Sequence, residues 1–336
     1  MACAENRLHV DTRVLVNLPA PPVGKTGWPW TADSRRPEDL DRPGFSWPLV
    51  TIVTPSFNQG GFIEETIRSV LLQDYPNLEY LVIDGASTDD TVQTLKKYEP
   101  WLSQWVSEPD RGQTHAINKG FRRARGEIVA WLNSDDTYEP HAIRSVVRHM
   151  VLNRATIAYG NCRLIDEAGR AIRAVVPPAV TYNSLLWFWT RPASTPPQPA
   201  IFFRRHVLEE VGLLDEALHY VMDYELWLRI SRKYSFSYVD ALLANYRIHS
   251  DSKTVSANEG FARERYQVSE RYGRSEGVGY HLSFWSSHAR YRVLVWRARL
   301  WSAMKRRRWL QPLTAVISKF ISSNAARPPR LTTGTQ

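Results

Sequence analysis

The 336-residue chain has only two cysteines and no long apolar run, and each shortage excludes a class of protein. Cys3 and Cys162 are too few for a disulfide framework or a four-thiolate zinc site. A membrane-spanning helix needs roughly 18 apolar residues, and the best uncharged stretch, residues 174–190, contains two prolines and an asparagine. Residues 1–10 lack the basic and apolar segments of a secretory signal. We therefore expect a cytoplasmic protein.

Three patterns that handle nucleotides or phosphates are missing after the first apolar run, which ends at Thr54. A dinucleotide oxidoreductase would carry G-x-G-x-x-G there, and a phosphatase with an aspartyl nucleophile would carry paired aspartates. A sugar-phosphate nucleotidyltransferase would carry a Gly-rich loop with Arg and Lys, whereas residues 55–60 read Pro-Ser-Phe-Asn-Gln-Gly. Among these three enzyme classes, the sugar-phosphate nucleotidyltransferases come nearest to this sequence.

Acidic residues are scarce near the end of the chain. From Phe261 onward there are 15 Lys and Arg residues but only 3 Asp and Glu residues. Residues 1–260 contain 28 Lys and Arg residues and 31 Asp and Glu residues. The formal net charge of +9 therefore comes from the tail and says nothing about the ligand of the main domain. A basic tail suits anionic lipid, nucleic acid or an acidic partner.

Strands and helices are predicted to alternate from residue 49 onward. Residues 1–47, rich in Pro, Trp and Arg, are predicted to form an extended arm that packs its tryptophans on the main domain. Apolar runs predict strands at 49–54, 81–83, 105–106 and 128–132, separated by segments with helical spacing. Because these strands are apolar on both faces, they indicate a parallel sheet covered on both sides.

Polar side chains follow three of these strands. Pro55-Ser56-Phe57-Asn58 follows the first, Asp84 ends the second, and Asn133-Ser134-Asp135-Asp136 follows the fourth. Ligands of such sheets bind at the carboxyl ends of the strands. Carboxylates gathered there repel one another unless a cation or ligand hydroxyls and amides satisfy them. Each aspartate alone suits a cap or turn, but together they predict a polar ligand site.

The ordered series of motifs resembles the inverting glycosyltransferases of family 2, which have the GT-A fold. The matching segments lie between residues 49 and 250 and read TPSFN (54–58), IDGASTD (83–89), EPDRGQ (108–113), AINKG (116–120), GEI (126–128), WLNSDD (131–136), MDYELWLR (222–229) and YRIH (246–249). The resemblance implies an α/β GT-A fold with a mixed, mainly parallel sheet and helices on both faces. The domain would span 48–260, with a nucleotide-sugar half (48–140) and an acceptor half (141–260). A basic helical tail (261–336) would follow the domain.

The resemblance assigns the donor site to the first strand ends. Pro55, Ser56 and Asn58 would form the first wall of the nucleotide pocket. Asp84 would accept a hydrogen bond from the base, which suits a uracil imide or a guanine edge. Arg111 would approach the phosphates or form a surface salt bridge.

Asn133-Ser134-Asp135 occupies the place of the family's Asp-x-Asp motif, which holds Mn²⁺ or Mg²⁺ against the diphosphate. Asn133 can still bond a ribose hydroxyl, but one negative charge of the motif is gone. Asp135 becomes the principal metal ligand, with Asp136 as a neighbouring candidate. His249 is either a ligand for the metal or phosphate, or a structural histidine.

Asp223 matches the family's catalytic base, which removes the proton of the acceptor hydroxyl. It also suits the cap of a helix beginning at Tyr224. Met222 stands where the family usually has an acidic residue. Glu225 is the fallback base or a helix-surface salt-bridge residue, and Gln198 would border the acceptor cleft.

These assignments imply transfer of a sugar from a UDP- or GDP-sugar to a hydroxyl acceptor with inversion, in polysaccharide, cell-wall or glycolipid assembly. The expected acceptor is a glycan or a lipid-linked glycan, and no specific nucleic acid is expected. The alternatives are a nucleotide-sugar-binding protein and a sugar-phosphate nucleotidyltransferase. Residues 305–308 (Lys-Arg-Arg-Arg) and neighbouring tryptophans predict peripheral attachment to the anionic inner face of the membrane. The alternative to membrane attachment is that the tail packs on the catalytic domain.

Overall fold

The computed structural model describes residues 18–32, 45–189, 195–250, 252, 258–274, 276–277 and 279–289. The chain divides into two compact units, residues 1–275 and 276–336. The second unit is described only around a helix over residues 279–289. No helix of the described segments is long and apolar enough to cross a bilayer.

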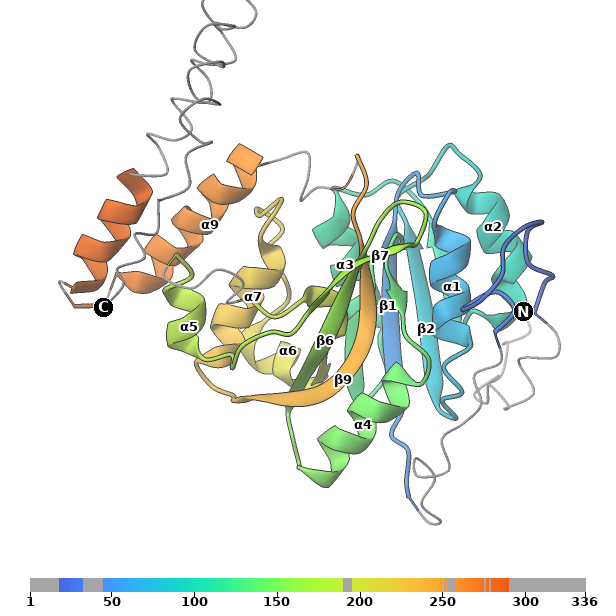
Figure 1. Ribbon diagram of the computed structural model, residues 1–336, viewed down its shortest axis with the longest axis horizontal. Helices are drawn as coiled ribbons and strands as arrows, with labels where there is room; N and C mark the ends of the chain where they lie inside the picture. The colour runs from blue at the N-terminus through green and yellow to red at the C-terminus, as the bar shows by residue number, and fades with distance from the viewer. Residues whose placement is uncertain are drawn as a thin grey trace, which may run out of the picture. The chain divides into compact units, whose positions relative to one another are not determined.

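A nine-stranded sheet forms the centre of the first unit (Figure 1), in the order β3-β2-β1-β4-β8-β6-β9-β5 with β7 paired to β6. The strands are β1 (Val50–Ser56), β2 (Leu78–Asp84), β3 (Gln104–Ser107), β4 (Ile128–Trp131), β5 (Thr137–Tyr138), β6 (Ile157–Ile165), β7 (Ala171–Val175), β8 (Ile201–Arg204) and β9 (Phe236–Arg247). Strands β3, β2, β1 and β4 pair in parallel, whereas β8 runs antiparallel to β4 and β6. This arrangement confirms the mixed α/β sheet of the predicted GT-A fold.

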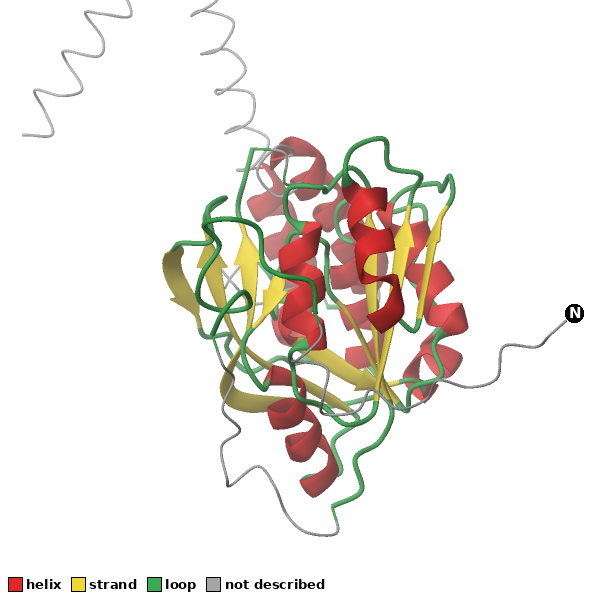
Figure 2. Cartoon of the chain, turned by 90° about the vertical axis from the view of Figure 1, so that its right-hand side faces the viewer, coloured by secondary structure: helices red, strands yellow, loops and turns green. Residues whose placement is uncertain are grey.

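Helices cover both faces of the sheet (Figure 2). They are α1 (Ile63–Leu71), α2 (Thr91–Tyr98), α3 (Gln113–Arg123), α4 (Ala142–Leu152), α5 (Tyr182–Leu186), α6 (His206–Val211), α7 (Met222–Ser231) and α9 (Asn258–Gly273), with 3₁₀ turns η3 (Glu99–Trp101) and η4 (Gln198–Ala200). They alternate with the first strands, as the apolar periodicity predicts.

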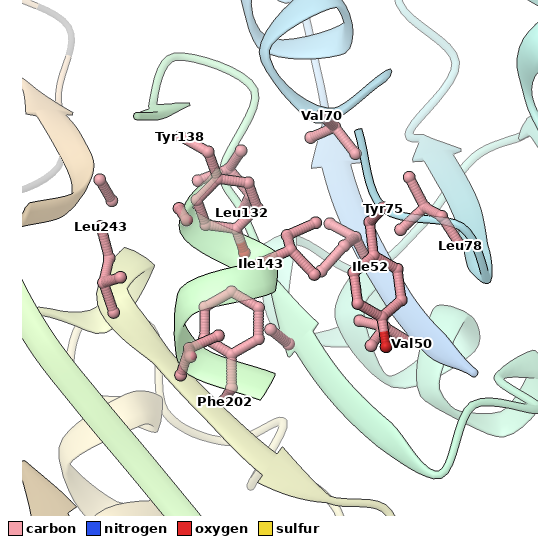
Figure 3. Close-up of a cluster of buried hydrophobic side chains, with 14 of the residues drawn as sticks. Val50, Ile52, Val70, Tyr75, Leu78, Leu132, Tyr138, Ile143, Phe202 and Leu243 are labelled. Carbon is pink, nitrogen blue, oxygen red and sulfur yellow. The ribbon is translucent and has the colours of Figure 1, made fainter. Parts of the chain in front are cut away.

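Neighbouring residues of each strand serve opposite faces of the sheet, because side chains alternate along a strand. Ile52 joins the core that α1 and α4 complete, including Val70 and Ile143 (Figure 3). The next residue, Val53, faces α3: a methyl group added to Gly120 would lie 2.3 Å from its Cγ1. The absence of a side chain at Gly120 therefore lets α3 approach the sheet closely.

The described part of the N-terminal arm packs on α1 and on the strand β5. Trp30 is buried, and the indole of Trp28 donates a hydrogen bond to the carbonyl of Tyr138 (2.8 Å). The buried guanidinium of Arg68 on α1 donates to the carbonyls of Pro29 and Trp30 (both 3.1 Å). Arm residues thus supply acceptors that a buried cation requires.

One helix start differs from expectation. Helix α7 begins at Met222 rather than Tyr224.

The first compact unit extends to residue 275, beyond the expected end of the catalytic domain at 260. Helix α9 lies in this extra segment and contacts α5 and α7. For example, the hydroxyl of Tyr182 on α5 donates to the carbonyl of Tyr272 (3.1 Å). The first turns of the expected basic tail therefore pack with α5 and α7.

Candidate active site

One cavity of about 720 Å³ opens beyond the carboxyl ends of β1 and β4. Most of the predicted site residues line it, namely Pro55, Ser56, Asn58, Asn133, Ser134, Asp135, Gln198 and Asp223. Asp84, Arg111, Asp136, Glu225 and His249 do not line it. The strand-end reasoning therefore located the cavity, and side-chain packing decided which polar groups reach it.

The loop after β1 forms one wall and is tied to the loop after β2. Asn58 has a positive φ of 52°, and its side-chain oxygen accepts a hydrogen bond from the backbone N–H of Thr88 (2.9 Å). The N–H of Asn58 donates to Ser87 Oγ (2.7 Å). In this wall Ser56 Oγ is buried and has no partner among the described residues. A bound ligand is one way to satisfy such a hydroxyl.

Asp84 is fully buried behind this wall. Its Oδ2 accepts hydrogen bonds from the Ser87 N–H (2.9 Å) and Ser107 Oγ (2.6 Å), and its Oδ1 accepts one from Ser87 Oγ (2.5 Å). The carboxylate thus joins the loop that follows β2 to the last residue of β3. These are contacts within the protein, and the base contact that the family resemblance implies for Asp84 stays a prediction.

Three side-chain amides form a chain at the end of β4. Gln113 donates to Asn133 Oδ1 (2.8 Å), and Asn133 Nδ2 donates to Gln198 Oε1 (3.2 Å) and to Asp136 Oδ2 (3.3 Å). Gln198 in turn donates to the carbonyl of Trp131 (2.7 Å). An aspartate at 133 would lack the donors and would place a second charge beside Asp136. The packing therefore explains why an amide stands at this position.

Asp135 and His249 meet beside the cavity. His249 Nε2 lies 3.0 Å from Asp135 Oδ2, and the imidazole packs on Phe62 with the ring centroids 4.8 Å apart. No group of three or more His, Cys, Asp or Glu side chains is placed to hold a metal in the described part of the chain. Two protein ligands are enough to bind a cation where phosphates of the substrate complete its coordination shell, as is usual for Mg²⁺. The Asp135–His249 pair therefore fits a cation that arrives with a diphosphate.

Asp136 lies behind this pair and is only 1% exposed. Its Oδ1 accepts the backbone N–H of Arg247 (2.9 Å), which connects the β4 turn to the end of β9. Burial, and next the charge of Asp135, raise the pKa of Asp136 well above its usual range. The side chain fastens the turn and does not reach the cavity.

Asp223 reaches the cavity from the first turn of α7. Its Oδ1 accepts the backbone N–H of Tyr224 (2.7 Å), and a negative charge in the first turn also suits the helix dipole. Burial raises the pKa of Asp223, while the positive charge of Arg265 acts in the opposite direction. The first turn of the helix thus fixes one carboxylate oxygen of Asp223.

Arg265 comes from α9, outside the motifs of the resemblance. Its guanidinium carbon lies 4.2 Å from the ring centroid of Phe188 and 5.0 Å from that of Tyr224. Nη2 donates to Thr195 Oγ1 (2.5 Å). Cation–π contacts of this kind compensate part of the lost hydration of a buried cation. The chain therefore keeps a positive charge near Asp223 without a direct ion pair.

Two other predicted residues form ion pairs outside the cavity. Arg111 pairs with Glu216 (2.5 Å), and its side chain is 70% exposed. Glu225 is buried and pairs with Arg229 (2.8 Å). The Arg111 contact matches the surface salt bridge that was the alternative for this residue, whereas the ion pair of Glu225 is buried rather than on the helix surface.

Sequence reasoning gave no role to several residues that line the cavity. Phe57 lies within the first motif and is 59% exposed, and Asp110 lies within EPDRGQ. Gln113, Trp131, Tyr220 and Tyr246 also line it. Motif position was the available signal for the first two, but only the folded chain shows that they face the ligand space.

Residues 51–212 match the family model for glycosyl transferase family 2. An uncharacterized glycosyltransferase of Rickettsia conorii is 32% identical over 221 residues, which cover 62% of this chain but only 36% of the relative. The Escherichia coli UDP-Glc:alpha-D-GlcNAc-diphosphoundecaprenol beta-1,3-glucosyltransferase WfgD is 29% identical over 216 residues, which cover 63% of this chain and 81% of the relative.

Solved structures of glycosyltransferases share the fold. Staphylococcus aureus TarS (residues 1–349) in complex with UDP-GlcNAc aligns with a TM-score of 0.54 and 18% identity, over 70% of this chain and 69% of TarS. The mannosyltransferase of Pyrobaculum calidifontis in complex with GDP-Man and Mn²⁺ aligns with a TM-score of 0.50 and 19% identity, over 87% of this chain and 90% of that chain. With its ordered motifs and this sheet, the region of residues 51–212 belongs to glycosyltransferase family 2, and the first unit has the GT-A fold.

Proposed function

We propose that this protein transfers a sugar, with inversion, from a UDP- or GDP-sugar to a hydroxyl of a glycan or lipid-linked acceptor. The product would enter polysaccharide, cell-wall or glycolipid assembly. The observation that carries the proposal is that Asp223 and the turn containing Asn133 and Asp135 line one cavity. A single displacement needs a base for the acceptor on one side of the sugar and charge stabilisation for the diphosphate on the other.

The donor would bind along the first strand ends. Pro55, Ser56 and Asn58 supply a wall, and the exposed ring of Phe57 offers an aromatic face on which a base can stack. Asn133 and Ser134 would reach the ribose hydroxyls. The printed names of WfgD and of the TarS complex contain UDP-sugars, and that of the archaeal mannosyltransferase contains GDP-Man. Both bases therefore remain in the proposal.

Asp135 and His249 would hold a divalent cation, which supplies neutralising charge to the leaving diphosphate. On the acceptor side, Oδ1 of Asp223 is held by the Tyr224 N–H. Oδ2 would take the proton of the acceptor hydroxyl as its oxygen forms the new bond to the anomeric carbon. The bond to the diphosphate breaks on the opposite face of the sugar, so the anomeric configuration inverts.

A thermal-shift panel tests the donor class. We expect UDP or GDP to raise Tm in proportion to ln(1 + [ligand]/Kd), and Mn²⁺ to increase the shift. The matching nucleoside monophosphate is the control, because it lacks the phosphate that bridges to the cation. No shift with any nucleoside diphosphate at millimolar concentration would contradict the proposal. Donor binding without release of the nucleoside diphosphate to any acceptor would favour a nucleotide-sugar-binding protein.

The second unit suggests where the enzyme works. Residues 277–336 contain eleven Lys and Arg and no Asp or Glu. In the helix over residues 279–289, Leu282 is 68% exposed and Trp285 is 53% exposed. Residues three apart lie on the same side of a helix. We propose that this apolar pair and the basic residues 305–308 attach the enzyme to an anionic membrane surface, the inner face in a cell.

Liposome flotation tests this attachment. We expect the full chain to float with vesicles that contain an anionic lipid and to be released as salt rises, because screening weakens attraction between the basic residues and the headgroups. A variant that ends at Gly277 should lose at least 90% of the bound fraction, whereas neutral vesicles should bind neither protein. Equal flotation of the truncated variant would show that the tail is not the attachment site.

A further inference from the structure

The cavity wall next to Asp223 is formed by the residues that precede helix α7. His219 and Tyr220, the 219–220 wall, line the cavity, as Asp223 does. They end the connection 212–221, which joins α6 to α7 and contains neither helix nor strand. Because the wall lies just before Asp223 in the chain, a hydroxyl that reaches the carboxylate brings the rest of its molecule close to these two side chains.

Helix α3 fixes the first part of this connection. Asn118 on α3 accepts the backbone N–H of Leu214 (3.1 Å) and donates to its carbonyl (3.0 Å). Thr114 on the same helix donates to the carbonyl of Leu218 (3.2 Å). These bonds end before the 219–220 wall begins, so the wall depends on another element for its support.

Helix α9 supplies the partner for the backbone of the wall. Glu264 Oε2 accepts the N–H of Tyr220 (2.8 Å), and Oε1 and Oε2 share the N–H of His219 (both 3.2 Å). Two successive N–H groups that converge on one point form a site for an anion, and the Glu264 carboxylate occupies it. A single oxygen, Oε2, therefore reaches both N–H groups.

Gly260 lies one turn before Glu264 on the same side of α9 and sets the place of the Tyr220 ring. A methyl group added to Gly260 would lie 2.7 Å from Cε2 of this ring and 3.2 Å from its Cζ. The edge of the ring thus rests on the backbone of α9, closer than a side chain at position 260 would permit. Helix α9 therefore fixes both the main chain and the ring of Tyr220.

The adjacent side of α9 packs on the helix that carries Asp223 (Figure 1). The guanidinium of Arg265 lies over the ring of Tyr224 on α7, and the hydroxyl of Tyr272 donates a hydrogen bond to Glu225 on α7. One helix thus holds the 219–220 wall and α7 in a single arrangement. The match to the family model ends at residue 212, before the wall and before α9.

We propose that α9 determines how the acceptor binds: Glu264 and Gly260 hold the 219–220 wall in the position in which it contacts the acceptor beside Asp223. This inference rests on the proposed function and adds two positioning residues to it. The donor walls come from other segments, the strand ends at 55–58 and 133–135. A change on α9 should therefore weaken acceptor binding and leave nucleotide affinity unchanged, which a general loss of structure would not do.

Hydrogen exchange of the full-length protein tests the positioning without any ligand. Glu264→Ala should speed exchange in the peptide that contains His219 and Tyr220 at least tenfold, because two amide hydrogens lose their acceptor. Glu264→Gln should stay within threefold of wild type, because its one side-chain oxygen can take the place of Oε2. Unchanged exchange in Glu264→Ala would overturn the assignment.

Transfer kinetics test the role in acceptor binding. The probes are UDP-glucose, UDP-GlcNAc and GDP-mannose as donors, with methyl and octyl glycosides of glucose, N-acetylglucosamine, galactose and mannose as acceptors. For the most active pair, Glu264→Ala should raise the acceptor KM at least tenfold, because the wall no longer holds the position that fits the acceptor. Glu264→Gln should stay within threefold of wild type. The Kd of the matching nucleoside diphosphate should stay within twofold in both variants.

Gly260→Ala separates the position of the ring from the stability of the helix. Alanine favours a helix more than glycine does, so Tm should be at least that of wild type. The added methyl group displaces the ring of Tyr220, so the acceptor KM should rise at least threefold. In a Tyr220→Ala background the same substitution should not change KM further, because the displaced ring is gone. An unchanged acceptor KM in Gly260→Ala, or an equal effect in both backgrounds, would exclude the ring contact.

Glu270→Ala is the matched control, because Glu270 is an exposed glutamate on the same helix. It should keep the wild-type acceptor KM and the wild-type exchange of the wall. A wild-type acceptor KM for Glu264→Ala, or an equal loss of nucleotide affinity, would overturn the role of α9 while leaving the proposed function intact. No transfer by wild type to any of the glycosides would instead contradict the proposed function, on which this inference rests.

Discussion

Asp223→Asn is expected to lower kcat by about 10²–10⁴-fold, the range in which a positioned general base contributes. The amide can still accept the N–H of Tyr224, so α7 should start at the same residue. Donor binding should stay within about twofold of wild type, because the substituted oxygen faces the acceptor. The measurements are nucleoside-diphosphate release for kcat and isothermal titration of the donor for Kd.

Glu225→Gln is the control on the same helix, because Glu225 does not line the cavity. Its kcat should remain within about threefold of wild type at temperatures below unfolding, although Tm should fall with the loss of charge opposite Arg229. Wild-type kcat for Asp223→Asn, or a larger loss for Glu225→Gln, would exclude Asp223 as the base.

The same assignment predicts the acid side of the pH profile. Burial raises the pKa of Asp223, and the base works only when ionised. Activity should therefore fall as pH decreases through this raised pKa, at a higher pH than for an exposed aspartate. Arg265 lowers the pKa of Asp223, so Arg265 shifts the acid limb toward lower pH and extends the active range.

Asp135→Asn is expected to lower kcat/KM by about 100-fold or more and to remove the tightening of donor binding by Mn²⁺. The substitution removes the charged oxygen that faces His249, so that only one of the two proposed protein ligands of the cation is left. Charge neutralisation of a leaving diphosphate is worth several kcal/mol, which sets the size of the loss. Isothermal titration of UDP and GDP with and without Mn²⁺ gives a readout that is independent of turnover.

Ser134→Ala is the matched variant in the same turn, because its side chain carries no charge. It should weaken the nucleotide without changing the ratio of Kd values measured with and without Mn²⁺. If Asp135→Asn kept the wild-type ratio, the cation would be held elsewhere or not needed.

The strand-end motifs predicted the sheet and the edge where the cavity lies, because both follow from local pattern. Apolar runs such as 49–54 can only be buried between two layers of helices, and parallel strands present their carboxyl ends at one edge. That logic brought Ser56, from the end of the first strand, together with Asn133 and Asp135, from the turn after the fourth predicted strand. It also placed Asp223 beside them through the family resemblance.

The strand-end motifs could not predict side-chain contacts between residues that are far apart in the sequence. Asp84 and Asp110 both follow strands, and nothing in their spacing says that Ser87 and Ser107 engage the first and leave an oxygen of the second unpaired. Arg265 lies outside every motif, and only the packing of α9 brings its charge near Asp223.

The sequence by itself determined the class of fold, the ligand edge and the chemical types available there, because hydrophobic periodicity and turn residues act over a few neighbouring positions. The tertiary structure decided which of those groups face the ligand. Hydrogen-bond saturation, burial and close approach, as at Gly260 beside Tyr220, depend on distances between segments that the linear order does not contain.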